Sequence, residues 1–292
     1  MSQAAVSKRV QTIHRSRRLP IPGEVLVQRG QQVAADTVIA YTEIPGVPIP
    51  VKVALRLSIE PKHIHRFMLK QEGDMVEAGE ALAVHTSLFG LSRDYVYSPR
   101  GGTVESISPQ TGVVVVREPS IPVSTLAYLP GEVEELIPGE GAVIKATGLV
   151  LTGVFGVGNE RFGPLLVPVE HPGQALSPDM LTSAARGAVV VGGGTVSAEV
   201  LKRAAQLQVA AIVSGSVSSA ALVEYLGYEV GVPITGQEDV VSTLIITSGF
   251  GSLPMDPELF GLLQASAGKM VSVNGTTHLR SQLIKPEVFI PA

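Results

Sequence analysis

Three glycine-rich segments in the C-terminal part of the chain follow predicted strands and carry hydroxyl side chains beside their glycines. Glycine lets a ligand approach the backbone, while free N–H groups and the dipole at a helix start favour an anion. Because the carboxyl ends of parallel strands meet at one edge of a sheet, we expect the three segments to form one crevice. The sequence therefore predicts a small anionic ligand, with phosphate, a nucleotide and a carboxylate as alternatives. The candidate ligand-binding residues are Gly192, Gly193, Gly194, Thr195, Ser214, Gly215, Ser216, Gly249 and Gly251.

A fourth loop, "PITGQED", adds Glu238 and Asp239 to the predicted crevice, and Arg280 is a candidate counter-charge for the anion. If the crevice is an active site, one of the two carboxylates would act as general base. The alternative is that the glycines only make tight turns and that Thr195 and Ser218 or Ser219 cap helices. The segments match neither the spaced dinucleotide fingerprint nor a phosphate loop, so the ligand class stays open.

Other reactive side chains give little support for catalysis, and no catalytic residue is assigned. The chain has no cysteine, which excludes disulfides, thiolate nucleophiles and Cys-ligated metals. It has no Gly-x-Ser-x-Gly elbow, and its histidines are scattered. His63 and His65 could share one face of a strand and bind metal, but no third ligand is near, and a short solvated helix is expected. No metal and no cofactor is predicted.

The elements that would position the crevice alternate between strands and helices from Arg186 onward. We expect helices over residues 195–209 and 218–230 and after Asp256, with Asp256 as the N-cap and Pro257 at the first helical position. Apolar strands precede each helix, and two more close the chain. This alternation predicts a small α/β domain with a mostly parallel sheet and right-handed crossovers.

The N-terminal part contains two internal repeats and is predicted to be all-β. "GQQVAADTVIA" from Gly30 and "GDMVEAGEALA" from Gly73 place Gly, Val and Ala at the same offsets. "GTVESISPQTGVVVV" from Gly102 and "GEVEELIPGEGAVIK" from Gly131 form a second pair. Each repeat reads as short strands joined by turns with glycine or proline. The segment "GVFGVGNERFG" is expected to be a closely packed loop.

Two motifs resemble those of biotinyl and lipoyl carrier domains. "EGDMVEAGEALA" is similar to the Gly-Asp-x-Val-x-x-Gly-x-x-Leu signature, and "SPRGGTVESI" is similar to the Ala/Ser-Pro-x-x-Gly-x-Val segment. The resemblance covers about residues 19–123 and implies a barrel-sandwich hybrid. The whole chain also resembles an uncharacterised bacterial family, on segments such as "EIPGVPIPVKVA" and "LIITSGFGSLPM". That second resemblance implies no activity.

The carrier lysine is missing. Carriers place it on the hairpin between the two motifs, which here reads "VHTSLFGLSRDYVY". No lysine occurs between Lys70 and Lys145, and Arg93 cannot form the amide because its guanidinium stays protonated. A biotin or lipoyl carrier role is therefore rejected. The apolar tip "SLFGL", from Ser87 to Leu91, is instead expected to dock a protein partner or the second domain.

Composition limits the remaining partners. The net charge of −4, with acidic residues in the repeated turns, argues against nucleic-acid binding. No apolar run is long enough to span a membrane, and the N-terminus has no secretory signal, so a cytoplasmic protein is expected. The first 18 residues carry Lys8, Arg9, Arg15, Arg17 and Arg18 and are expected to form a solvated arm. The alternative is a patch for an acidic partner or anionic lipid.

Together these features predict a mixed two-domain protein. We expect a basic arm over residues 1–18, an all-β barrel-sandwich hybrid with an extra hairpin over 19–168, a linker over 169–185 and the α/β domain over 186–292. The leading hypothesis is a non-catalytic binding or scaffolding protein. The alternatives are an enzyme acting at the glycine-rich crevice and an adaptor subunit of a larger assembly. The repeated strand edges also predict a homo-oligomer.

Overall fold

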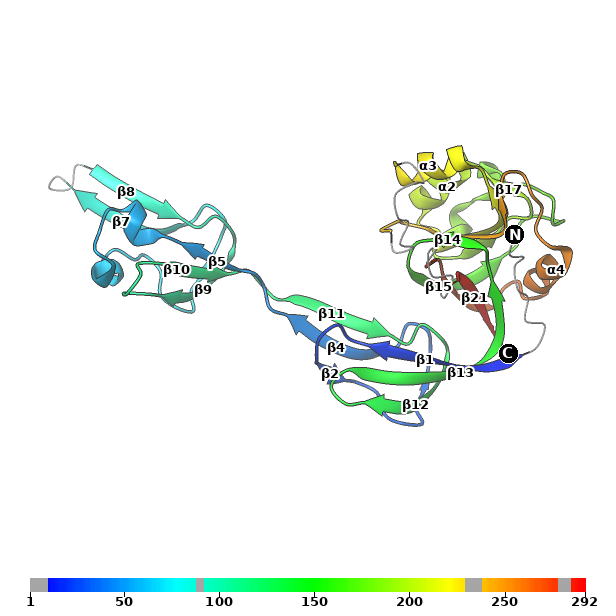
Figure 1. Ribbon diagram of the computed structural model, residues 1–292, viewed down its shortest axis with the longest axis horizontal. Helices are drawn as coiled ribbons and strands as arrows, with labels where there is room; N and C mark the ends of the chain where they lie inside the picture. The colour runs from blue at the N-terminus through cyan, green and yellow to red at the C-terminus, as the bar shows by residue number, and fades with distance from the viewer. Residues whose placement is uncertain (1–9, 88–91, 229–237, 278–284) are drawn as a thin grey trace. The chain divides into compact units, whose positions relative to one another are not determined.

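A computed structural model describes residues 10–87, 92–228, 238–277 and 285–292 (Figure 1). Strands hold 43% and helices 16% of them, so the protein is mostly β with one large mixed sheet. The chain divides into two compact units. The first comprises Met1–Arg18, Glu24–Ala40 and Thr125–Ala292, and the second comprises Leu19–Gly23 and Tyr41–Ser124. Among the residues that the structure describes, no helix is long and apolar enough to cross a membrane.

One extended sheet runs through the first unit. Its order is β14-β19-β18-β16-β15-β20-β21-β13-β12-β3, and β1 pairs with β13. The pairs β15–β16, β16–β18 and β18–β19 are parallel, whereas β13–β21 and β15–β20 are antiparallel. The strands are β1 (Gln11–Arg18), β3 (Gln32–Val33), β12 (Gly131–Ile137), β13 (Gly141–Thr152), β14 (Phe155–Val157), β15 (Glu160–Leu166), β16 (Val189–Val191), β18 (Ala211–Val217), β19 (Thr243–Phe250), β20 (Met270–Asn274) and β21 (Glu287–Pro291).

The expected division at residues 168 and 186 differs from these units. β13 and β15, expected in an all-β domain, pair with β21 and β16 of the C-terminal part. Long-range pairing of this kind leaves no local trace in the sequence, because each strand shows only its own alternation. The segment expected as a closely packed loop contains β14 and the first four residues of β15.

The helices of the first unit form where the sequence predicts them. They are α2 (Ala198–Leu207), α3 (Ser219–Leu226) and α4 (Pro257–Ala265). Asp256 Oδ1 accepts from the N–H groups of Glu258 and Leu259 at 2.9 and 3.1 Å, which confirms the predicted N-cap. Ser218 caps α3, but the cap of α2 is Ser197 rather than Thr195. One apolar core of mainly aliphatic side chains joins these helices to the sheet.

Residues 11–18 are not a solvated arm. They form β1, which pairs along its whole length with β13. Its basic side chains meet carboxylates: Arg15 with Glu287 and Arg18 with Glu140, both at 2.6 Å. The acidic partners lie more than 100 residues away in sequence, so composition alone suggested an unpaired basic segment.

The second unit encloses its own core between short antiparallel strands. One sheet has the order β5-β10-β9-β6, and β7 and β8 form a separate hairpin. Val76, Leu82, Val96 and Val104 are buried in this core. The elements are β5 (Pro48–Val51), α1 (Val53–Arg56), the short helix η1 (Pro61–Arg66), β6 (Met75–Val76), β7 (Ala81–Ser87), β8 (Ser92–Tyr97), β9 (Gly102–Ile107) and β10 (Val114–Arg117).

The two sequence repeats build the same local structure twice. Gly30 and Gly73 have φ values of 82° and 93°, which favour glycine, and their N–H groups donate to Val133 and Val104 at 2.7 and 2.8 Å. The register also repeats: Gly131 lies opposite Val33, and Gly102 lies opposite Val76. We call residues 11–18, 24–44 and 121–150 the first β module and residues 45–120, which lie within the second unit, the second β module. The predicted repeats are confirmed.

The second β module is inserted into a hairpin of the first. β4 (Val38–Ile44) precedes β7 by 43 residues with the same length, and β11 (Ile121–Leu126) follows β8 by 29 residues with the same length. β4 and β11 are neighbours in a three-stranded sheet with β2 (Glu24–Val25). They therefore correspond to the hairpin β7–β8, and residues 45–120 occupy the place of its tip.

Candidate functional site

The three glycine-rich segments come together at the carboxyl ends of β16, β18 and β19. Ser214 Oγ donates to Gly194 O at 2.7 Å, and the N–H of Ser216 donates to the same oxygen at 3.2 Å. Thr195, in β17 (Thr195–Val196), donates its hydroxyl to Gly251 O at 3.1 Å. The parallel strands thus place the segments side by side, in accordance with the topology predicted from the sequence.

The polar groups of this crevice form hydrogen bonds with other segments of the chain. The N–H of Met255 donates to Gly193 O at 2.7 Å, and that of Gly194 donates to Gln174 O at 2.8 Å. Ser216 Oγ donates to Leu253 O at 2.9 Å and accepts from the N–H of Leu253 at 2.8 Å. Donors that an anion would need are therefore engaged by two neighbouring segments, residues 171–174 and 253–255.

The glycines are required by this close backbone packing. A Cβ atom at Gly193 would overlap His171 O, and one at Gly215 would lie 2.6 Å from Met255 N. Residues 169–185, expected as a linker, supply one side of the contact and bury Leu176 and Leu181. They also contain the short helices η3 (Pro178–Met180) and η4 (Ser183–Ala185). The composition of this segment suggested a linker because its turn residues outnumber its few buried leucines.

Glu238 and Asp239 do not reach the crevice. They precede β19, whereas Gly249 and Gly251 lie at its other end. At about 3.3 Å per residue, the eight-residue strand separates the two sets by about 26 Å. Asp239 is exposed, and the N–H of Val240 donates to Glu238 O at 2.8 Å. Arg280 and residues 88–91 of the hairpin tip lie outside the described residues.

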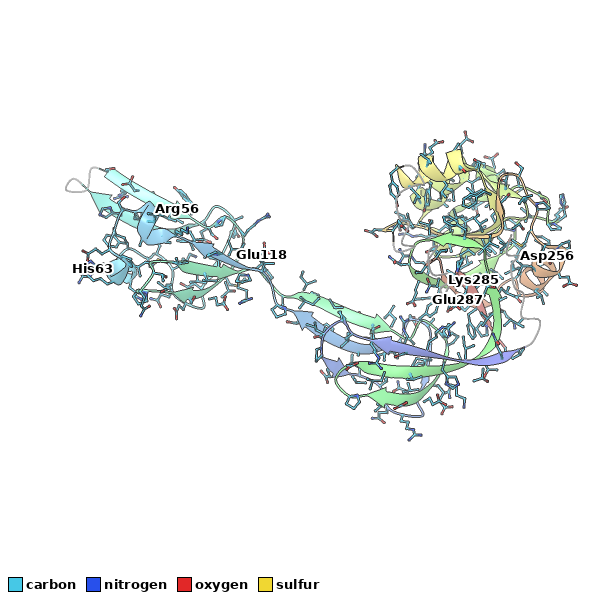
Figure 2. All side chains as sticks on the ribbon, viewed as in Figure 1. Arg56, His63, Glu118, Asp256, Lys285 and Glu287 are labelled. Atoms are coloured by element: carbon cyan, nitrogen blue, oxygen red, sulfur yellow. The ribbon has the colours of Figure 1, made fainter. Side chains whose placement is uncertain are left out.

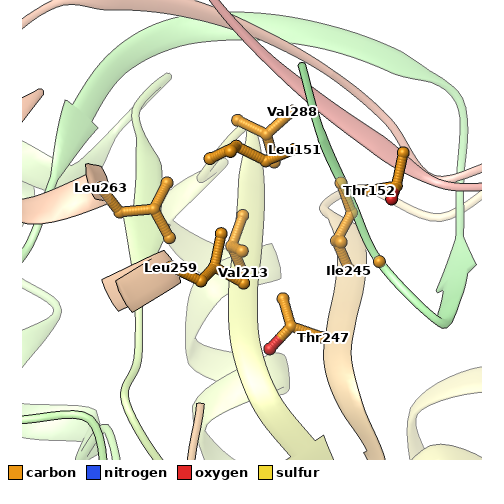
Figure 3. Close-up of a pocket in the computed structure, with 9 residues that line it drawn as sticks. Leu151, Thr152, Val213, Ile245, Thr247, Leu259, Leu263 and Val288 are labelled. Carbon is orange, nitrogen blue, oxygen red and sulfur yellow. The ribbon is translucent and has the colours of Figure 1, made fainter. Parts of the chain in front are cut away.

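A gap between α4 and the sheet is apolar and narrow (Figure 3). About 200 Å³ of space without atoms lies along it, open solvent included, but the gap is nowhere wide enough for a water molecule. Its two hydroxyl side chains are Thr152 and Thr247, and Thr247 donates to Ser214 O at 3.2 Å. A gap of this kind provides no solvated acid or base.

Tyr128 forms the centre of a charged cluster in the first β module. Its side chain is buried, its φ is 67°, and Arg17 lies over its ring at 5.4 Å. Arg17 binds both carboxylate oxygens of Glu160, at 2.8 and 2.6 Å. The Tyr128 hydroxyl donates to Glu287 at 3.5 Å, and Glu287 begins β21 (Figure 2). The cluster therefore joins β1, β15 and β21.

Burial raises the pKa of Tyr128 well above its usual value, and the charges of Glu287 and Glu160 act in the same direction. A phenol with a raised pKa keeps its proton, so Tyr128 donates a hydrogen bond and does not serve as a base. Since each arginine in the cluster is bound to a carboxylate, the geometry favours a structural role that links strands.

The hairpin β7–β8 is the segment in which the resemblance to carrier domains predicts a lysine. On one face of β8 the side chain of Val96 is buried, whereas Tyr95 and Tyr97 on the other face are 41% and 51% exposed. Their rings stack with centroids 6.0 Å apart. Beside the hairpin, Phe67 packs edge-on against His85 at 5.0 Å. Sequence inspection missed these exposed tyrosines, although the alternation in "YVY" indicates them.

The outer edge of β8 has no strand beside it in the part of the chain that the structure describes, where β8 pairs with β7 alone. An open edge with exposed aromatic side chains is a typical place for another strand to add.

The histidine pair lies in a short helix. His63 and His65 lie in η1, as the expectation of a short helix stated, and His63 is 3.9 Å from Glu60. Among the described residues no three His, Asp or Glu side chains are grouped to hold a metal.

A comparison of the chain with protein-family models, with curated proteins and with solved structures found no match.

Proposed function

We propose that the chain is a non-catalytic scaffolding protein whose second β module binds a protein partner through the hairpin β7–β8. The observation that carries this proposal is the stacked pair Tyr95 and Tyr97, exposed beside the open edge of β8. Large exposed aromatic groups are frequent at protein interfaces, where they bury much area at a low cost in side-chain entropy.

We also propose that each β module is a barrel-sandwich hybrid. Support comes from two antiparallel layers around one core in the second module and from the same turns in the first. In the first module the insertion of residues 45–120 takes the place of the carrier tip, and the hairpin of the second module has no lysine. Neither module can therefore carry biotin or lipoate at the usual position. A mass spectrum of the native protein with such an adduct would contradict this.

The experiment uses a photo-crosslinking amino acid, benzoylphenylalanine, at Tyr95 and, as a control, at Tyr228, which is 42% exposed in the first unit. Irradiation of cells that produce each full-length variant should give protein adducts from position 95 and few from position 228. Adducts from position 95 should disappear when Tyr97→Leu is added. Equal adducts from both positions, or none at all, would contradict the proposal.

Anion binding at the crevice is the alternative that remains from the sequence. It requires residues 253–255 to move, because Leu253 and Met255 occupy the donors and acceptors there. Titration calorimetry with inorganic phosphate tests it directly. Saturable binding that is lost in Gly192→Val would favour the anion-binding alternative, whereas no measurable heat is the result that scaffolding predicts.

An enzyme at the crevice is supported less well, because Glu238 and Asp239 lie at the opposite end of β19. An adaptor in a larger assembly would use the same hairpin as the scaffold and is not a separate site.

A further inference from the structure

The duplicated modules allow one strand edge to be compared with its own counterpart. β8 in the second module corresponds to β11 in the first at an offset of 29 residues. At the position of Arg93, β11 has Pro122, and where β8 has Tyr95 and Tyr97, β11 has Ser124 and Leu126. Proline lacks the N–H that a pairing strand needs and is a common means of blocking an edge. β11 is thus blocked at the position where β8 is open.

Hydrogen bonds on the β7 side of β8 show which residues of β8 direct their backbone N–H and C=O groups toward the open edge. The N–H of Ser98 donates to Glu80 O at 2.8 Å, and the corresponding N–H of Ala127 donates to Thr37 O at 2.9 Å. Since successive residues of a strand point their backbone groups to opposite sides, those of Arg93, Tyr95 and Tyr97 face away from β7. This agrees with proline at the position of Arg93 in β11, because a proline nitrogen must face away from its ladder.

We propose that this edge pairs with β8 of a second copy of the chain, in antiparallel register around a two-fold axis at Tyr95; this rests on the proposed role of β8 as a binding edge. In that register Tyr95 faces its own copy, and Arg93 faces Tyr97 at both ends. Each Arg93 guanidinium then lies opposite the Tyr97 ring of the other copy. Asp94 lies opposite Val96, so no like charges oppose each other. The two hairpins become one four-stranded sheet.

Self-complementarity is the reason to prefer a second copy to an unrelated peptide. The three outward-facing residues Arg93, Tyr95 and Tyr97 form two cation–aromatic pairs and one aromatic pair with themselves, which satisfies both strands without a further sequence. An isologous contact also closes after two copies, so it leaves no edge for open-ended growth through this strand.

Disulfide trapping tests the register, since the chain contains no cysteine. In Tyr95→Cys the two introduced thiols meet across the axis, where Cα atoms of a hydrogen-bonded antiparallel pair lie about 5.5 Å apart, within disulfide range. In Tyr97→Cys the two thiols are separated by four residues of strand, about 13 Å. We expect the first full-length variant to form a disulfide-linked dimer under mild oxidation and the second to stay monomeric on non-reducing gels.

Analytical ultracentrifugation of the cysteine-free chain provides the second measurement. The wild type should dimerise as its concentration rises, and Arg93→Pro and Tyr97→Leu, which copy the first module, should weaken dimerisation at least tenfold. Tyr228→Ser should not change it. Circular dichroism and the melting temperature verify that Arg93→Pro is folded, and Tyr97→Leu keeps the test valid if it is not.

The outcomes separate this inference from the proposed function. A wild type that stays monomeric, while benzoylphenylalanine at position 95 still gives adducts with another protein, overturns the dimer and leaves the scaffolding role intact. A dimer that persists in Arg93→Pro and Tyr97→Leu overturns the β8 interface. A monomer without adducts from position 95 overturns both.

Discussion

The two β modules share their turns and differ in the strands that surround them. In the first module, β13 is twelve residues long and pairs with β1, β12 and β21. In the second, the corresponding β10 has four residues and pairs only with β5 and β9 among the described strands. The first module is therefore held to the α/β part by continuous sheet, whereas the second is attached through β4 and β11. The two modules therefore share their turns and register and differ at their strand edges.

The largest effect on stability is expected from substitutions at Gly102 and Gly131, one in each module. A Cβ atom at Gly102 would overlap Arg117 O, and one at Gly131 would overlap Lys145 O. We expect Gly102→Ala to destabilise the second module by about 3 kcal/mol, since backbone must move to relieve the overlap. Proteolysis followed by mass spectrometry should show cleavage confined to residues 41–124, while Gly131→Ala should open the first unit.

Gly101→Ala is the matched control, because its Cβ would lie 3.5 Å from Val76 O, an ordinary contact. Cleavage throughout the chain in Gly102→Ala would show that the two modules do not unfold separately.

Arg17 and Arg18 distinguish a cluster from a surface pair within β1. Arg17 is 14% exposed and donates to both Glu160 oxygens and to Leu126 O. We expect Arg17→Ala to lower the free energy of unfolding by about 2 kcal/mol, because it leaves a carboxylate and a carbonyl without their donor. Arg18, at 56% exposure beside Glu140, should cost at most about 0.5 kcal/mol as alanine. Equal costs in urea unfolding would contradict the role of the Tyr128 cluster.

Tyr128 gives the first module a buried tyrosine that the second lacks at the corresponding position, which is Pro99. Burial raises the pKa of Tyr128, so the folded chain keeps the proton where the unfolded chain loses it. The stability that this neutral tyrosine contributes is complete below about pH 10 and is lost as pH rises, by up to about 1.4 kcal/mol per pH unit.

Tyr128→Phe removes this ionisation together with the hydrogen bond to Glu287. The variant should be less stable than wild type at pH 8, and the difference should shrink as pH rises above 10, measured by urea unfolding. A difference that is constant between pH 8 and 11 would show that Tyr128 titrates normally.

The smallest effect on stability is expected when the side chain that accepts the hydrogen bond in the repeated turn is exchanged for the one in the other module. The N–H of Ala34 donates to Thr37 Oγ1 at 3.0 Å, and that of Glu77 donates to Glu80 Oε2 at 2.9 Å. Glu80→Thr should shift the melting temperature by no more than about 2 °C, because the hydroxyl can accept the same hydrogen bond. Glu80→Ala is the control and should have a larger effect. A large loss in Glu80→Thr would mean that the ion pair of Glu80 with Lys70 matters more than the turn.

The candidate site was predictable where it depends on local signals. Strand ends rich in glycine identified the three segments that meet, and Asp256 and Ser218 were identifiable as caps. The filling of the crevice was not predictable, because residues 171–174 and 253–255 reach it only after β16, β18 and β19 are paired. Likewise, Glu238 precedes β19. Because β19 runs parallel to β18, the end of β19 meets the crevice, and its start, next to Glu238, lies at the opposite edge of the sheet.

By itself the sequence determined the repeated turns, the helices and their caps, and the absence of an acceptor lysine. These follow from backbone preferences of glycine and proline, from periodicity and from side-chain chemistry, all of which act within a few residues. Only the tertiary structure decided that one module is inserted into a hairpin of the other, that β1 is a strand with paired charges, and that β8 keeps an open edge. Those features depend on which distant strands hydrogen-bond to one another, and strand pairing is chosen by the whole fold rather than by any one segment.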